Sequence, residues 1–246
     1  MSGHSKWHNI AQKKGKTDAA RANVFTKIGR EIAVAVKAGG PDPNSNSKLR
    51  DVISKAKAAN MPNDNITRSI KKASGEGSTV NYEEMTYEGY GVGGTAFIVE
   101  ALTDNKNRTA GDVRHLFDKF GGSLGATGCV SYMFKKKGII IVDKTTISED
   151  ELMLTALDLG AEDINSDDEF FEIVTAPTDV FKIKEALEAA GIKVENAQVD
   201  MIADTESELD EKQQETILKL VDKLEELDDV QNVYHNAVIT IADEEE

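Results

Sequence analysis

The sequence contains a single cysteine, Cys129, among its 246 residues. One cysteine cannot form an internal disulfide, and it leaves no set of thiolates for a structural zinc site. A nucleophilic role for Cys129 is disfavoured as well, because no histidine or other base lies near it in the sequence. This cysteine usage fits a reducing compartment, and we expect a cytoplasmic protein.

Long hydrophobic runs are absent from the sequence. No stretch approaches the ~18 apolar residues that a membrane-spanning helix needs. The first residues carry charge, but the apolar core of a signal peptide does not follow them. We therefore expect a soluble protein without a membrane partner and without a secretion signal.

Motifs for catalysis, metal binding and nucleotide binding are also lacking. The series Gly89-x-Gly91-x-x-Gly94 matches the dinucleotide fingerprint in form, but that fingerprint must precede a helix, and a strand-like segment follows here. We interpret it as a glycine-rich hairpin. His4 and His8 have a helical metal spacing without a third ligand nearby. We expect no enzymatic activity, no cofactor, no metal and no small-molecule substrate.

Charge is distributed very unevenly along the chain. The net charge is −15, yet residues 1–77 hold 15 Lys and Arg against 6 Asp and Glu, whereas residues 78–246 hold 14 against 38. A basic segment on an acidic protein indicates a polyanionic partner for that segment. We interpret the acidic remainder as surface that keeps the protein soluble and resists non-specific collapse onto nucleic acid.

The basic segment begins with an arm that shows no apolar periodicity and then continues into an amphipathic helix. The only tryptophan of the chain lies in this arm, where it can stack on a base while neighbouring cations hold phosphates. A basic tail without a specific role is the alternative. The candidate nucleic-acid-binding residues are Lys6, Trp7, Asn9, Lys13, Lys14, Lys16, Arg21, Lys27 and Arg30.

Helical periodicity predicts a small antiparallel bundle after the arm. Its helices are expected at residues 19–38, from about residue 47, and from about residue 63. The apolar face of the first helix includes Phe25 and Ile32. Five further cations of the bundle, taken singly, are interpreted as solvated side chains: Lys55, Lys57, Arg68, Lys71 and Lys72.

The remainder of the chain predicts two mixed domains. Strands at 82–91 and 95–102, a helix at 107–120 and a strand at 129–134 begin the first domain, and a helix ending near residue 227 with two strands after it completes the same sheet. Between these segments the pattern βαββαβ indicates a ferredoxin-like arrangement. The expected fold is α+β and multidomain, with an arm and helical bundle at 1–78, an α+β domain at 79–135 plus 206–246, and an inserted ferredoxin-like domain at 136–205.

A second candidate contact lies around the helix at 107–120 and the glycine-rich segment after it. Arg108 falls in the first turn of this helix, where a cation is unfavourable against the helix dipole. The glycines that follow permit close approach of the backbone to a ligand, or they only end the helix and form a loop. The candidate residues here are Asn107, Arg108, Arg114, Gly122 and Gly125.

Several segments together resemble the YebC/PmpR family: GHSKWHNI, QKKGKTDAARANVFTKIGREI, AGGPDPNSNSKLR, YEGYGVGGTAFIVEALTDNKNRT, GGSLGATGCVSYMF and DDVQNVYHN. The resemblance covers essentially the whole chain. It implies an N-terminal helical bundle and two α+β domains, one inserted in the other. It also implies a cytoplasmic transcriptional regulator that binds DNA.

Other relatives of that family point to translation instead. A mitochondrial relative activates translation of cytochrome c oxidase, and some bacterial relatives relieve ribosome stalling at proline runs. The resemblance therefore leaves two hypotheses open. In the first the protein is a regulator that binds duplex DNA, and in the second it is a ribosome-associated translation factor that binds ribosomal RNA.

The basic arm leads to a prediction about salt. If the arm neutralises ~5 phosphates, the affinity for duplex DNA should fall with a log–log slope near −4.5 against salt concentration. Between ~50 and ~200 mM salt this amounts to a loss of several hundredfold. Titrations by fluorescence anisotropy at several salt concentrations measure the slope. Binding that is independent of salt would rule out phosphate contacts by the arm.

Overall fold

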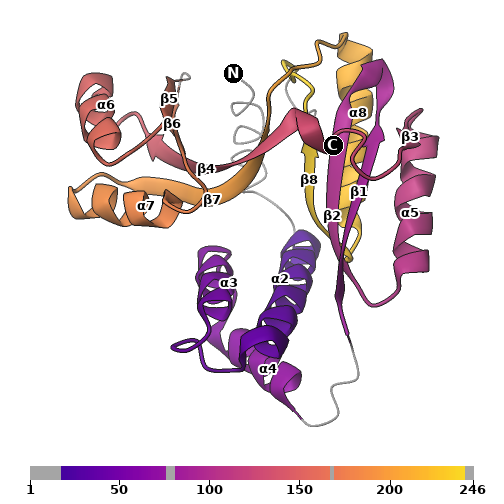
Figure 1. Cartoon of the computed structure of the whole chain (residues 1–246), viewed down its shortest axis with the longest axis horizontal. Helices are drawn as coiled ribbons and strands as arrows, with labels where there is room; N and C mark the ends of the chain where they lie inside the picture. Colours follow the sequence, from indigo (N-terminus) through magenta and orange to yellow (C-terminus); the bar gives the residue numbers. More distant parts are fainter. Residues whose placement is uncertain (1–17, 76–80, 167–168, 242–246) are drawn as a thin grey trace. The chain divides into compact units, whose positions relative to one another are not determined.

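A computed structural model describes residues 18–75, 81–166 and 169–241 of the chain (Figure 1). The described residues form two compact units. Residues up to Val130 together with Asp210–His235 make up the first unit, and Ser131–Leu209 together with the residues from Asn236 onward make up the second.

The first unit begins with three helices, α2 (Asp18–Gly39), α3 (Ser47–Ala58) and α4 (Asn63–Ser74). Their shared core consists of the fully or nearly buried side chains Ile28, Ile32, Ala35, Val36, Leu49, Val52, Ala56, Met61 and Ile66. Phe25 is only half buried at the edge of this core. The Asn46 side chain caps α3 by accepting from the amide of Leu49, and it donates to the carbonyl oxygen of Ala35 at 2.8 Å. This residue therefore fastens the loop between the first two helices.

A four-stranded antiparallel sheet forms the rest of the first unit. Its strands are β1 (Glu83–Tyr90), β2 (Ala96–Thr103), β3 (Ser123–Leu124) and β8 (Val230–His235), in the order β3-β1-β2-β8. The helices α5 (Lys106–Lys119) and α8 (Glu211–Glu226) belong to this unit, and Phe117 of α5 packs edge-on against Phe97 of β2. A short 3₁₀ turn, η2 (Val92–Gly94), joins β1 to β2. The glycine series at residues 89–94 is thus a hairpin, as the sequence predicted.

The second unit contains the predicted βαββαβ arrangement. Its elements are β4 (Phe134–Asp143), α6 (Glu149–Asp158), β5 (Asp163–Ser166), β6 (Phe170–Thr175), α7 (Val180–Ala189) and β7 (Val194–Ala203). The strands pair antiparallel in the order β5-β6-β4-β7, which is the ferredoxin-like order. One face of this sheet forms a core with α6 and α7. The expected α+β fold class is confirmed.

Two expected strands are absent from the described structure. The segment at 129–134 instead contains a 3₁₀ turn, η3 (Ser131–Met133), before β4 begins at Phe134. The buried carboxylate of Glu88 accepts hydrogen bonds from the amides of Gly128 and Val130, so the backbone entering this segment bonds to a side chain rather than to a neighbouring strand. Within residues 237–241 the backbone forms only an isolated bridge, between Ala237 and Ser207.

The bundle core leads to a stability prediction. Ile32 is fully buried, so Ile32→Ala should lower the free energy of unfolding by ~2–5 kcal/mol through lost burial and a residual cavity. Val24 on the same helix is 42% exposed, and Val24→Ala should change the free energy by less than ~0.5 kcal/mol. Urea denaturation of both variants tests this. Equal effects would mean that α2 does not pack through the Ile32 face.

Candidate nucleic-acid interface

The predicted arm residues lie outside the described part of the chain. This applies to Lys6, Trp7, Asn9, Lys13, Lys14 and Lys16, whose role in binding nucleic acid stays a prediction. The other predicted residues can be located in the structure. Arg21, Lys27 and Arg30 lie on α2, and the second candidate group lies on α5 and in the loop after it.

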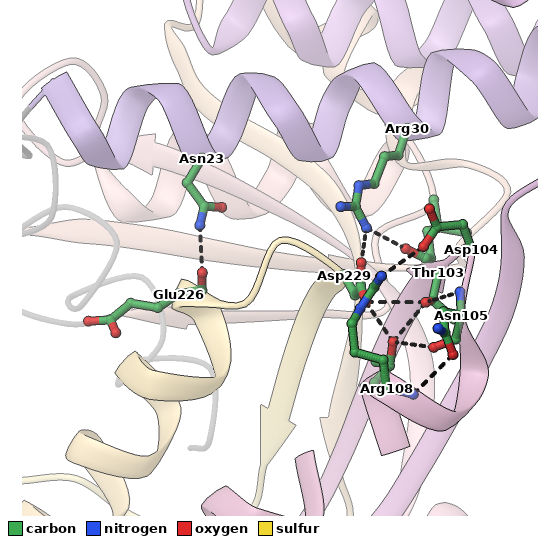
Figure 2. A network of polar contacts seen from close by, with 10 residues as sticks. Asn23, Arg30, Thr103, Asp104, Asn105, Arg108, Glu226 and Asp229 are labelled. Carbon is green, nitrogen blue, oxygen red and sulfur yellow. Dashed lines mark hydrogen bonds and ion pairs between the residues drawn. The ribbon is translucent and has the colours of Figure 1, made fainter. Parts of the chain in front are cut away.

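Two predicted cations of α2 make hydrogen bonds within the protein, and Figure 2 shows those of Arg30. The guanidinium of Arg30 pairs with the carboxylate of Asp229 and donates to the carbonyl oxygen of Leu102 at 2.9 Å. The ammonium of Lys27 donates to the carbonyl oxygen of Glu225 at 2.6 Å. Arg21, nearer the start of α2, is exposed. The polar face of α2 thus joins the bundle to the end of α8 and to β2.

Asp229 is the centre of this network. Besides Arg30, its carboxylate accepts from Arg108 at 2.7 Å, from the hydroxyl of Thr109 at 2.6 Å and from the hydroxyl of Thr103 at 3.2 Å. Burial alone would raise the pKa of Asp229, but the hydrogen bonds from Arg108, Arg30 and Thr109 outweigh it and lower the pKa to about 2. Asp229 is therefore a carboxylate at neutral pH.

The same network accounts for the position of Arg108 in the first turn of α5. Its guanidinium bonds to Asp104 at 2.8 Å as well as to Asp229, and these hydrogen bonds raise its pKa above the ordinary value. Two carboxylates within bonding distance offset the unfavourable helix dipole. Asn107 and Arg114, the other helix residues of the second candidate group, are exposed on α5.

Gly122 and Gly125, the two candidate glycines after α5, are in close contact with other parts of the protein. A Cβ at Gly122 would lie 2.6 Å from the carbonyl oxygen of Tyr90, and a Cβ at Gly125 would lie 2.5 Å from the sulfur of Cys129. Burial, and then the charge of Glu88, raises the pKa of the Cys129 thiol, which keeps it protonated at neutral pH. Packing within the protein therefore explains the glycines at these two positions, and contact with a ligand is not needed to explain them.

The described cations of the bundle that could bind an external anion lie on α3 and α4. Five side chains there are exposed and make no hydrogen bond or ion pair with any described residue: Arg50, Lys57, Arg68, Lys71 and Lys72. By contrast, Lys48 pairs with Glu84 at 3.3 Å and Lys55 with Glu31 at 2.6 Å. From the sequence alone, Lys57, Arg68, Lys71 and Lys72 are interpreted as solvated side chains. Their helical spacing, with Arg68, Lys71 and Lys72 on one side of α4, was the available signal.

The second unit contains a larger pocket, and its lining is rich in acidic side chains. A pocket of about 420 Å³ lies over its sheet, and Asp163, Glu172, Asp204 and Glu206 contribute to the lining. The two lysines of the lining form ion pairs within the protein, Lys135 with Asp204 and Lys137 with Glu162. Such a lining is unfavourable for a polyanion. Within residues 18–75, 81–166 and 169–241, no cluster of three metal-ligating side chains occurs and no helix is long and apolar enough to cross a membrane.

Comparison with known families identifies the chain over nearly its whole length. A family model described as "TACO1/YebC protein N-terminal domain" matches residues 5–76, and one described as "TACO1/YebC second and third domain" matches residues 82–237. The chain belongs to the TACO1/YebC family. The two matches together span the helical bundle, both sheets and α8.

Individual relatives support the same assignment. A protein of Acetivibrio thermocellus named "Probable transcriptional regulatory protein" is 64% identical, over 96% of this chain and 98% of its own. A similarly named Thermoanaerobacter pseudethanolicus protein is 58% identical, over 97% of this chain and 98% of its own. The crystal structure of a conserved hypothetical protein from Aquifex aeolicus, 45% identical, superposes with a TM-score of 0.83 over 96% of this chain and 99% of that one.

The Asp229 network predicts a pH dependence of stability. Because the folded-state pKa lies below the ~3.9 of an unfolded aspartate, the stabilisation is present above pH ~4 and is lost as the pH falls towards 2. The stability difference between wild type and Asp229→Asn should therefore shrink by ~1 kcal/mol from pH 5 to pH 3. Urea denaturation at both pH values measures it. A difference that stays constant would show that Asp229 has an ordinary pKa.

Proposed function

We propose that the protein is a non-enzymatic regulator that binds the phosphate backbone of nucleic acid through exposed cations of its helical bundle. The observation that carries this proposal is the set of five unpaired cations on α3 and α4. Elsewhere in the described chain acidic side chains predominate, so these helices form the favourable approach for a polyanion. The basic arm that precedes α2 adds further positive charge to the same end of the sequence.

Such an interface is expected to bind nucleic acid with low sequence specificity. Lysine and arginine side chains on phosphates fix position and orientation, whereas specificity requires contacts to base edges. The interface residues on α3 and α4 are all lysines and arginines, the residue types that serve phosphates best. We therefore expect high affinity at low salt and little discrimination among duplex sequences.

Duplex DNA is the first candidate target. Relatives that are 58–64% identical are named as transcriptional regulatory proteins, and that role would place this protein on DNA in the cytoplasm. Ribosomal RNA, with a role in translation, is the second candidate. It is favoured by one structural observation, a small pocket beside the cations of α4 that contains an aromatic side chain. Such a pocket suits a base that has left the stack, and ribosomal RNA exposes bases of that kind.

Matched pairs of charge removals test the proposed interface. Lys71→Gln/Lys72→Gln removes two unpaired cations, and Lys48→Gln/Lys55→Gln removes two cations that are already paired with acids. The first variant should reduce the log–log salt slope on duplex DNA by ~1.8, the value for two phosphate contacts. The second should change it much less. Anisotropy titrations with duplex DNA and with a folded ribosomal RNA fragment give both slopes.

Two outcomes would contradict the proposal. Equal slopes for the two variants would mean that the unpaired cations of α4 have no special role. Failure of the wild type to bind either polymer at low salt would mean that the protein is not a nucleic-acid-binding regulator. The polymer on which Lys71→Gln/Lys72→Gln has the larger effect identifies the preferred target.

A further inference from the structure

An open pocket of about 260 Å³ lies between α2 and α4 of the helical bundle. Its lining residues are Phe25, Thr26, Met61, Asn65, Arg68 and Ser69. The volume falls just below the ~300–1,000 Å³ of sites for drug-sized ligands, so the pocket suits a smaller group. No network described above uses it.

Two of the lining residues are apolar, and one of them is aromatic. Met61 is buried in the bundle core, and Phe25 is half buried against the same core. The first helix was expected to place Phe25 in the interior, but the phenyl ring lies at the edge of the core and lines the pocket. An aromatic ring held by core packing on one side and accessible on the other is a platform on which a planar ring can stack.

Polar side chains make up the rest of the pocket lining. Asn65, Arg68 and Ser69 lie on successive turns of α4, and their side chains make no hydrogen bond or ion pair with any described residue. The hydroxyl of Thr26 donates to the carbonyl oxygen of Ala22 and keeps its lone pairs for a further donor. A carboxamide supplies both a donor and an acceptor to the edge of a base, and a guanidinium suits a phosphate.

We infer that this pocket receives an unstacked nucleobase, which stacks on Phe25 and hydrogen-bonds to Asn65 while Arg68 holds a flanking phosphate. The inference rests on the proposed nucleic-acid binding and names the feature that the bundle recognises. The exposed acid Asp64 precedes Arg68 by one helical turn and would repel a phosphate, whereas Lys72 follows it by one turn. The backbone of the bound strand therefore runs on the Lys72 side of the pocket.

This assignment distinguishes the bundle from a purely electrostatic clamp. Perfect duplexes keep their bases stacked, so they would contact the cations of α3 and α4 and leave the pocket empty. A bulge or single strand can supply both the phosphate and the base. The shared ligand chemistry is an unpaired nucleobase with its 3′ or 5′ phosphate, and either RNA or DNA could provide it.

The test uses hairpins that differ in one nucleotide. The full-length protein is titrated with a hairpin that carries a single 2-aminopurine bulge, with the same hairpin that carries an abasic bulge, and with the fully paired hairpin. Each is made in RNA and in DNA. The base-containing bulge should bind roughly 5- to 150-fold more tightly than the abasic bulge, the range expected for stacking of one base. The 2-aminopurine fluorescence should change on binding.

Three variants test whether the preference for a base over an abasic site arises in the pocket. Asn65→Ala, on a helix where alanine is well tolerated, and Phe25→Leu, which retains apolar packing, should each reduce the preference for the base over the abasic site. Arg50→Gln removes an unpaired cation of α3, which does not line the pocket, and should weaken all hairpins equally. Thermal midpoints of the variants confirm that the bundle remains folded.

The outcomes separate this inference from the proposed function. Equal affinity of wild type for base-containing and abasic bulges, or an unchanged preference in Asn65→Ala and Phe25→Leu, would overturn the pocket assignment while nucleic-acid binding stands. Absence of binding to every hairpin would overturn both. A preference confined to the RNA set would support an RNA base as the ligand, and one confined to the DNA set would support a DNA base.

Discussion

A single carboxylate, that of Asp229, holds together parts of the chain that are far apart in sequence. Arg30 of α2 and Arg108 of α5 both bond to it, and the hydroxyls of Thr103 and Thr109 donate further hydrogen bonds to it. A buried carboxylate is costly unless it is paired and hydrogen-bonded, so the loss of one partner is expected to lower the stability of the fold. The network therefore links the helical bundle to the sheet that contains β2 and β8.

Because of this linkage, some cations of the bundle are bonded within the protein and others could bind nucleic acid. Arg30 and Lys27 look from the sequence like the exposed face of an amphipathic basic helix, yet both bond to acceptors from residues 102 and 225–229. Their role in binding nucleic acid stays a prediction, and the structure shows a second use for them. The unpaired cations lie instead on α3 and α4, and the nucleic-acid interface that we propose follows from that distribution.

Local sequence signals were sufficient for most of the fold. Helical periodicity located α2, α3 and α4, the glycine series marked the β1–β2 hairpin, and alternation of elements indicated the ferredoxin-like sheet. Features that depend on distant partners could not be predicted. Arg30 and Asp229 are 199 residues apart, and the amides of Gly128 and Val130 bond to Glu88, about 40 residues earlier in the chain. The pocket between α2 and α4 likewise appears only once the helices are packed.

A double-mutant cycle on Arg30 and Asp229 tests the central claim most directly. Arg30→Gln, Asp229→Asn and the double variant are compared for free energy of unfolding and for nucleic-acid affinity. The structural account predicts a coupling in stability of ~0.5–3 kcal/mol, as for residues of one hydrogen-bond network, and an affinity per folded molecule that hardly changes in Arg30→Gln. A negligible coupling together with a large loss of affinity in Arg30→Gln would show that Arg30 is a nucleic-acid contact and not the link between bundle and sheet.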